Sequence, residues 1–398
     1  MTSFLLARAG RKMKTKLYIS LTLMMVFISS VSQGQEKTLK GVYDGAFKIG
    51  TSVSRFQYGG RDTRGLEILL KHFNALSPEN DMKPEVIHPN PDTWNFGPGD
   101  AYVKFGQEHG MWMLGHTLCW HNQTPDFFWF DEKGNPKSKE KLFETIEEYI
   151  KTVCTHFKGQ VQAWDVINEM IGEDGKYRDL GWVHALGGDQ DVVDEFVKHV
   201  FRCAQKYAPD TELYYNDFNA WRPAKVAGIL RVVEMLKAEG IRIDGVGIQG
   251  HWGLNFPKTE YIEAAIDEYS KHGLRVNITE LDIDVLPVSK EGQVFGWQGL
   301  KDPLYQLEEF EEFLDPYKNG LPDEVEKQQA ARFAEVMAIF YRHRDQIDRV
   351  TLWGITDGMS WKNGYPIPNR VNYPLLFKRD YTPHKSLDAV LSVPDWIK

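Results

Sequence analysis

The sequence predicts an α/β protein built as a single (β/α)₈ barrel, the TIM-barrel architecture, with extended βα loops. Short apolar runs alternate with amphipathic helical stretches eight times along the chain, which is the pattern of such a barrel. A barrel typically needs about 250 residues, so the rest of a 398-residue chain lengthens its loops, notably after the seventh strand. A doubly wound open sheet is the alternative. However, no glycine-rich phosphate loop follows the first strand and the pattern shows no topological break.

Each expected strand is a short apolar run, and each is followed by a stretch of helical periodicity. The strands are expected at Ala46–Ser54, Phe73–Asn80, Trp112–Trp120, Gln162–Glu169, Glu212–Asn219, Gly245–His251, Arg275–Ile283 and Arg349–Asp357. The helices are expected near residues 62–72, 100–110, 142–158, 192–208, 224–239, 259–272, 324–346 and 385–392. Glycines directly after three of these helices, Gly159, Gly240 and Gly273, favour left-handed helix ends.

The amino terminus predicts a signal peptide over residues 1–32, followed by one barrel domain over residues 33–398. A cationic stretch ends at Lys16, the apolar segment Leu17–Ile28 follows, and small polar residues precede an expected cut near Gln33. This apolar segment is shorter than the roughly 20 residues that span a bilayer. We therefore expect cleavage and export, to the periplasm or the medium, rather than a membrane anchor.

Composition and charge exclude several classes of partner. Hydrophobic residues make up 42% of the chain, enough for a sizeable core. Asp and Glu outnumber Lys and Arg by 56 to 47, a formal net charge of −9. Because a negative surface repels phosphate backbones and anionic lipid, we expect no nucleic-acid partner and no membrane partner after signal cleavage. We expect a monomer.

The three cysteines, Cys119, Cys154 and Cys203, are too few and too widely spaced for a disulfide framework. Whether Cys154 and Cys203 pair is left open, because pairing requires their helices to touch. Neither a CxxC pair nor a Cys/His ligand cluster is apparent in the sequence, so we expect no metal.

Polar side chains follow nearly every expected strand. Active sites of these barrels lie at the carboxyl ends of the strands, where the βα loops converge. Those ends carry, in chain order, Glu79–Lys83, His116–His121, Asn168–Glu169, Tyr215–Asn219, Gln249–His251, Glu280–Asp282 and Trp353–Asp357. A purely structural barrel would not bear the desolvation cost of so many polar groups at one rim.

Two carboxylates, Glu169 and Glu280, close the fourth and seventh strands. A lone Glu there is explained by a salt bridge, whereas two, flanked by Asn168 and Asp282, favour a paired acid and base. Glycoside cleavage needs such a pair, because one carboxyl protonates the leaving oxygen while the other attacks the anomeric carbon. We expect a raised pKa for Glu169, the general acid and then base. Glu280, bonded by His251 that Asp282 orients, suits the nucleophile. No cofactor is expected, because side chains fill both roles.

Four motifs at these strand ends are Trp164–Glu169 (WDVINE), Gly115–His121 (GHTLCWH), Thr279–Ile283 (TELDI) and Trp353–Trp361 (WGITDGMSW). Together they resemble family 10 glycoside hydrolases, the retaining endo-β-1,4-xylanases, in order from about Gly50 to Leu387. The resemblance implies a barrel that hydrolyses internal bonds of xylan and xylo-oligosaccharides, with Glu169 as acid/base and Glu280 as nucleophile.

The resemblance also implies a set of sugar contacts along a cleft. The expected contacts are Glu79, Asn80, Lys83, His116, Trp120, Asn168, Tyr215, Gln249, His251, Trp353 and Trp361. The first three would hold the sugar two places to the non-reducing side of the cut, and Tyr215 would border the leaving-group side. Asn168 would bond the 2-hydroxyl, where hydrogen bonds tighten in the transition state. The indoles of Trp353 and Trp361 would leave little room for the hydroxymethyl arm that distinguishes glucose from xylose.

Two other functions share parts of this pattern. A barrel acting on glucose-based β-1,4 glucans would carry both glutamates and prefer cellulosic oligomers to xylan, and a non-catalytic polysaccharide-binding barrel would lack one of the glutamates. The insertion at residues 286–321 is either a solvated surface excursion or a wall of the cleft. His384 stands where the family commonly has Lys, and we expect it at the surface.

Overall fold

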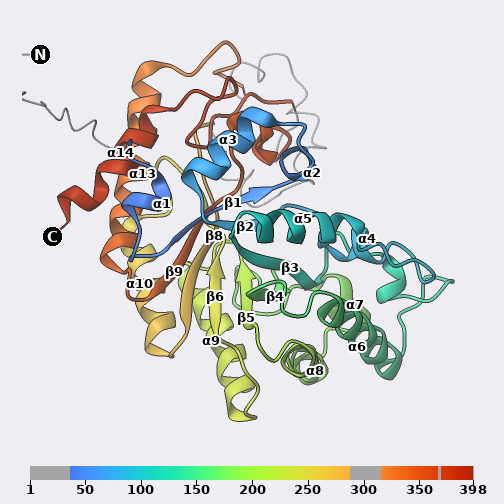
Figure 1. Cartoon of the computed structure of the whole chain (residues 1–398). Helices are drawn as coiled ribbons and strands as arrows, with labels where there is room; N and C mark the ends of the chain where they lie inside the picture. The colour runs from blue at the N-terminus through green and yellow to red at the C-terminus, as the bar shows by residue number, and fades with distance from the viewer. Residues whose placement is uncertain (1–35, 287–314, 366–368, 398) are drawn as a thin grey trace, which may run out of the picture. The chain divides into compact units, whose positions relative to one another are not determined.

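The computed structural model describes residues 36–286, 315–365 and 369–397. Within residues 37–398 the strands lie at the centre and the helices surround them, which confirms the predicted (β/α)₈ barrel (Figure 1). The expected signal peptide at residues 1–32 and most of the insertion at residues 286–321 lie outside the described residues. Across the described part of the chain, no helix is long and apolar enough to cross a membrane.

Eight parallel strands close the barrel. They are β1 (Lys48–Val53), β2 (Ala75–Pro78), β3 (Trp112–Trp120), β4 (Ala163–Asn168), β5 (Glu212–Asp217), β6 (Gly245–Ile248), β8 (Arg275–Asp284) and β9 (Ile347–Leu352). Neighbours in the chain are neighbours in the sheet, and β9 pairs with β1 to close the ring. The short strand β7 (His251–Gly253) pairs with the later part of β8, whose earlier part pairs with β6. The sixth wall of the barrel is therefore interrupted at Gln249 and Gly250.

Helices cover the outside of the barrel and begin at recognisable caps. The helices of eight or more residues are α3 (Thr63–His72), α5 (Gly97–Glu108), α6 (Lys139–His156), α8 (Gln190–Tyr207), α9 (Pro223–Ala238), α10 (Thr259–Lys271), α13 (Asp323–Arg342) and α14 (Lys385–Trp396). The shorter ones are α1 (Leu39–Val42), α2 (Arg55–Tyr58), α4 (Pro84–Ile87) and α7 (Gly181–Ala185). Asp62, Ser138 and Asp189 accept hydrogen bonds from first-turn N–H groups of α3, α6 and α8.

The predicted strands and helices all occur, and most differences lie at their ends. The expected sixth strand, Gly245–His251, is instead broken at Gln249 and Gly250 into β6 and the start of β7. The eighth expected strand, Arg349–Asp357, is β9, which ends at Leu352. The strand cannot continue through Gly354, because its φ is 135°, and the chain turns there. His384 is buried, with Nε2 2.6 Å from Asp357 and Nδ1 2.9 Å from Glu326, so its expected surface position is wrong.

All three cysteines are buried free thiols. Cys154 and Cys203 therefore do not form the disulfide that the sequence left open.

Close packing between β3 and β4 depends on a glycine in β3. Gly115 is the register partner of Trp164 on β4, and a Cβ added to Gly115 would lie 2.3 Å from the indole of Trp164. Because Trp164 is itself buried, its ring has no room to withdraw. Only glycine fits at this position.

Replacing Gly115 by Ala should lower the free energy of unfolding by about 1–3 kcal/mol, because the methyl group overpacks the strand pair. Urea denaturation of the purified protein measures this. The control is Gly97→Ala at the exposed start of α5, where the nearest atom to the new Cβ is 3.7 Å away, and where we expect a change within about 0.5 kcal/mol. Equal losses in both variants would contradict the packing argument.

Candidate active site

A cleft of about 740 Å³ opens where the barrel strands end. It is lined by Glu169, by Glu280 and by every predicted sugar contact except Tyr215. These residues lie in or after β2, β3, β4, β6, β8 and β9, and Glu280 lies inside β8 rather than at its expected end. The parallel barrel thus gathers side chains from distant parts of the sequence. The walls of the cleft include Glu79 and Arg222.

A second hollow, of about 840 Å³, lies apart from this cleft. It is formed by the segment before α5, the loop after β3 and the outer face of α6, and His88, Trp94 and Phe127 are among its walls. It contains none of the predicted site residues. Size alone does not identify a site. The gathering of interacting ionisable groups does so better, and it favours the smaller cleft.

Glu280 lies within β8 and is held by two side-chain donors. Asn216 Nδ2 donates to Oε1 at 2.9 Å, and His251 Nε2 lies 3.1 Å from Oε2. The other ring nitrogen of His251, Nδ1, lies 2.9 Å from Asp282 Oδ2. His251 and Asp282 are register partners between β7 and β8. Strand pairing therefore aligns Asp282, His251 and Glu280 in one row.

The charge of His251 follows from these neighbours. Burial lowers the pKa of His251, but the charge of Asp282 and the hydrogen bonds to Asp282 and Glu280 outweigh burial and raise it to about 9. Near neutral pH the imidazolium donates from both nitrogens. Asp282 is held in turn by Trp361, whose Nε1 donates to Oδ2 at 3.0 Å. Glu280 thus faces a fixed cation.

Glu169 directly follows β4 in the left-handed conformation, with φ 58°, which is uncommon for a residue with a side chain. Trp120 Nε1 donates to Oε2 at 3.0 Å and Gln249 Nε2 donates to Oε1 at 2.9 Å. Arg178 Nη1 lies 3.6 Å from Oε2. Sparsely populated backbone conformations of this kind cluster at functional sites.

The predicted raised pKa of Glu169 is wrong for this conformation. Burial raises its pKa, but the hydrogen bond from Gln249, the charges of His121 and Arg178 and the hydrogen bond from Trp120 outweigh burial and bring the pKa below its ordinary value. Burial also lowers the pKa of His121 to about 4, so Arg178 is the cation beside Glu169 at neutral pH. The prediction considered the other carboxylate but could not see Arg178, which arrives from the loop after β4.

Asparagine side chains connect the two glutamates. Asn216 Nδ2 donates to Asn168 Oδ1 at 2.9 Å as well as to Glu280, and Thr279 Oγ1 donates to Asn216 Oδ1 at 2.6 Å. Gln249 Nε2, which holds Glu169, lies 3.5 Å from the same Asn168 oxygen. Asn168 is therefore oriented from two sides between the carboxylates.

One wall of the cleft is a cluster around Lys83. Lys83 Nζ donates to Asn80 Oδ1 at 3.0 Å and to Gln123 Oε1 at 2.6 Å, and it lies 4.9 Å from the Trp120 ring centre. Burial lowers the pKa of Lys83 and raises that of Glu79. Gln123 was not predicted, although it follows the strand-end motif that ends at His121.

The cleft is closed by aromatic rings near the glutamates. Trp353 lies edge-on to His116 at 5.8 Å between ring centres, and Trp361 stacks on Tyr365 at 5.0 Å. The sequence analysis missed Tyr365 and Arg178, because each reaches the cleft from a loop with no periodic signal.

Tyr215 does not lie where it was predicted. It is buried, and its hydroxyl accepts hydrogen bonds from the backbone N–H groups of Met170 and Ile171 at 3.2 and 3.1 Å. It also donates to Asp217. Tyr215 thus supports the backbone that follows Glu169 rather than bordering the cleft.

Comparison with known proteins identifies the family. Residues 38–393 match the description of glycosyl hydrolase family 10. The chain belongs to this family. The resemblance drawn from the four sequence motifs is therefore confirmed, and the family match spans the whole barrel and both glutamates.

Relatives and solved structures align over most of their length. The chain is 37% identical to endo-1,4-beta-xylanase A of Xylanibacter ruminicola, over 91% of this chain and 94% of that protein. It is 34% identical to a beta-1,4-xylanase of Dictyoglomus thermophilum, over 93% of this chain and 95% of that protein. A family 10 endoxylanase structure from a sugarcane soil metagenome superposes with a TM-score of 0.80 at 35% identity, covering 90% of this chain and 99% of that one.

The charged His251 should make this family 10 barrel lose stability in alkali. Its pKa is raised above its usual value of 6.5 to about 9 by folding, so its contribution is complete below pH 6.5 and disappears as the pH rises through about 9. Urea denaturation from about pH 6 to about pH 10 should show that the free energy of unfolding falls by up to about 3 kcal/mol in the wild type. The His251→Gln variant should not show this fall. The control is His184→Gln at an exposed histidine, in which the free energy of unfolding should depend on pH as in the wild type. The same pH dependence in His251→Gln would contradict the assignment.

Proposed function

We propose that this protein is an endo-1,4-β-xylanase that cleaves internal bonds of xylan with retention of anomeric configuration. The observation that carries the proposal is the pair of differently held carboxylates, Glu169 and Glu280, in one cleft with Trp353 and Trp361. The xylanase activities named for the relatives support the choice of substrate.

In the proposed reaction Glu280 attacks the anomeric carbon while Glu169 gives a proton to the leaving glycosidic oxygen. The product of this step is a covalent ester between the sugar and Glu280. Glu169, now ionised, takes a proton from a water that attacks the same carbon and regenerates the Glu280 carboxylate. Two inversions leave the configuration unchanged.

The roles follow from the different neighbours of the two groups. A nucleophile must stay ionised and aimed, and Glu280 accepts from Asn216 and from cationic His251. A general acid must gain a proton before the bond breaks. Substrate entering the cleft excludes water from Glu169, which raises its pKa above the low value that the Gln249 and Trp120 donors and Arg178 maintain without substrate.

The proposed sugar contacts are those that the family resemblance implies. Glu79, Asn80 and Lys83 hold the sugar two places to the non-reducing side of the cut, and Asn168 binds the 2-hydroxyl of the sugar being cleaved. His116, Trp120, Gln249 and His251 surround that sugar. Trp353 and Trp361 restrict the space beside it, which favours xylose over glucose because a hydroxymethyl group has no room.

We further propose that the protein is exported after removal of residues 1–32 and acts as a monomer without a cofactor. The cationic and apolar pattern of that segment supports export. A glucan-cleaving barrel remains the competing function, because it would use the same two glutamates.

Product analysis tests the function. A linear xylo-oligosaccharide is hydrolysed and the first-formed anomer is followed by NMR. We expect internal cleavage and the β anomer as the first product, because double displacement retains configuration. Initial release of the α anomer would refute the mechanism, and faster cleavage of cellulosic oligomers than of xylo-oligomers would refute the specificity.

Variants of the two glutamates test their roles. Glu280→Ala should remove almost all turnover on every substrate. Glu169→Ala should lose about 10²–10⁴-fold on xylan but much less on aryl xylosides, whose phenolate leaving group needs no proton. Added azide should give a β-azide product with Glu169→Ala, because it intercepts the glycosyl-enzyme, and an α-azide with Glu280→Ala.

The control for these variants is Glu132→Ala, at an exposed residue of the second hollow, which should keep wild-type rates. The role assignment is wrong if Glu169→Ala loses as much activity on aryl xylosides as on xylan. It is also wrong if Glu169→Ala gives the α-azide and Glu280→Ala the β-azide.

A further inference from the structure

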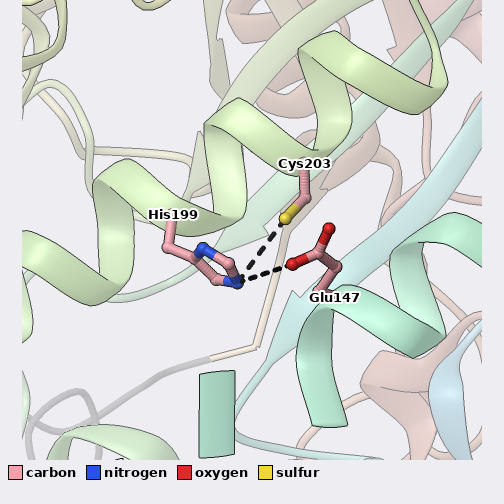
Figure 2. A group of neighbouring side chains, drawn as sticks. All are labelled: Glu147, His199 and Cys203. Carbon is pink, nitrogen blue, oxygen red and sulfur yellow. Dashed lines mark hydrogen bonds and ion pairs between the residues drawn. The ribbon is translucent and has the colours of Figure 1, made fainter. Parts of the chain in front are cut away.

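A cluster of three potential metal ligands lies on the outer ring of helices. Figure 2 shows Glu147 on one helix facing His199 and Cys203 on another. Glu147 belongs to α6, and the other two residues belong to α8, which packs against α6. His199 and Cys203 are four positions apart and therefore share one helix face. None of the three lines the substrate cleft.

The distances between the donor atoms fit a small metal ion. His199 Nε2 lies 3.6 Å from Cys203 Sγ and 3.8 Å from Glu147 Oε2, and all three donor atoms lie within 4.8 Å of one another. Zinc binds nitrogen and oxygen at about 2.0–2.2 Å and sulfur at about 2.3 Å in a tetrahedron, which places neighbouring donors about 3.4–3.6 Å apart. Small side-chain rotations close the remaining difference.

The other oxygen of Glu147 already has partners. Lys206 Nζ donates to Oε1 at 3.1 Å and the Tyr207 hydroxyl donates to it at 2.8 Å. These contacts leave Oε2 turned toward His199. Hydrogen bonds of this kind orient the ligands of metal sites.

The protonation states show what binding must displace. His199 binds a metal ion as the neutral imidazole. Its Nε2 lies 3.2 Å from the Phe143 carbonyl oxygen, so the ring proton moves to Nδ1 when Nε2 binds metal. The ligand form of Cys203 is the thiolate, so the metal ion displaces the thiol proton to solvent.

We propose that Glu147, His199 and Cys203 form a Zn²⁺ site that joins α6 to α8, with water in the fourth position. One imidazole, one thiolate and one carboxylate suit zinc, whereas calcium and magnesium require oxygen ligands. Glu147 and His199 are partly exposed, which gives the ion access. The bound ion cross-links two helices of the outer ring. The sequence analysis expected no metal, because it overlooked the His199–Cys203 spacing and could not bring Glu147 to it.

The test uses the purified, metal-free protein. Calorimetric titration with zinc chloride should show one saturable site, and zinc should raise the melting temperature by an amount that grows with the logarithm of its concentration above the dissociation constant. Titration with cobalt chloride should produce a thiolate-to-cobalt charge-transfer band and the intense visible bands of tetrahedral cobalt. The cobalt spectrum reports sulfur ligation independently of enzyme activity.

Three variants and a matched control locate the site. Cys203→Ser should abolish the charge-transfer band. His199→Gln and Glu147→Gln should each weaken zinc binding at least roughly tenfold, because loss of a residue that only supports a ligand already costs that much. His272 supplies the control. It lies between Glu234 and Glu268 without a thiol, so His272→Gln should bind zinc as the wild type does. Circular dichroism confirms that each variant folds. If a change on α8 prevents folding, zinc binding by Glu147→Gln, at a partly exposed residue of α6, tests the site instead.

The proposal is overturned if the wild type shows no saturable zinc site, or if the cobalt complex lacks the thiolate band. It is also overturned if zinc affinity is unchanged in Glu147→Gln, or if His272→Gln loses as much affinity as the variants of the cluster.

Discussion

The pairing of β7 with β8 is the interaction on which the candidate site depends. The sixth wall of the barrel breaks after Ile248, and the chain resumes beside the later part of β8. That resumption puts His251 opposite Asp282 and within reach of Glu280. The paired backbone therefore fixes the position of the cationic His251, which flexible side chains alone would not do. The interruption also includes Gln249, whose side chain donates to the other glutamate.

The two glutamates differ in what surrounds them rather than in depth alone. Glu280 sits inside a strand, between an asparagine and a histidine that strand register aligns. Glu169 sits just beyond a strand, where indole, amide and guanidinium groups converge. Asn216 and Asn168 join the two settings through shared hydrogen bonds. A disturbance at one carboxylate is therefore transmitted to the other through a short chain of amides.

Much of this was predictable from sequence, and the failures have physical causes. Alternating periodicity located all eight barrel strands, and polar residues after apolar runs located the glutamates, because strand geometry dictates both. Tyr215 was misplaced because side chains alternate along a strand: Asn216 of β5 donates to Glu280, so the neighbouring Tyr215 faces the opposite side of the sheet. Arg178 and the Glu147 cluster depend on loops and helices that approach from elsewhere in the chain. His384 was misjudged because the burial of an isolated polar residue leaves no trace in the sequence pattern.

The cation beside Glu169 comes from the connection between β4 and α7, not from a strand. Strands of a barrel constrain one another through continuous pairing, whereas a connecting segment is free to vary in length and composition. The acidity of the group after the fourth strand can therefore drift during evolution while the barrel stays intact.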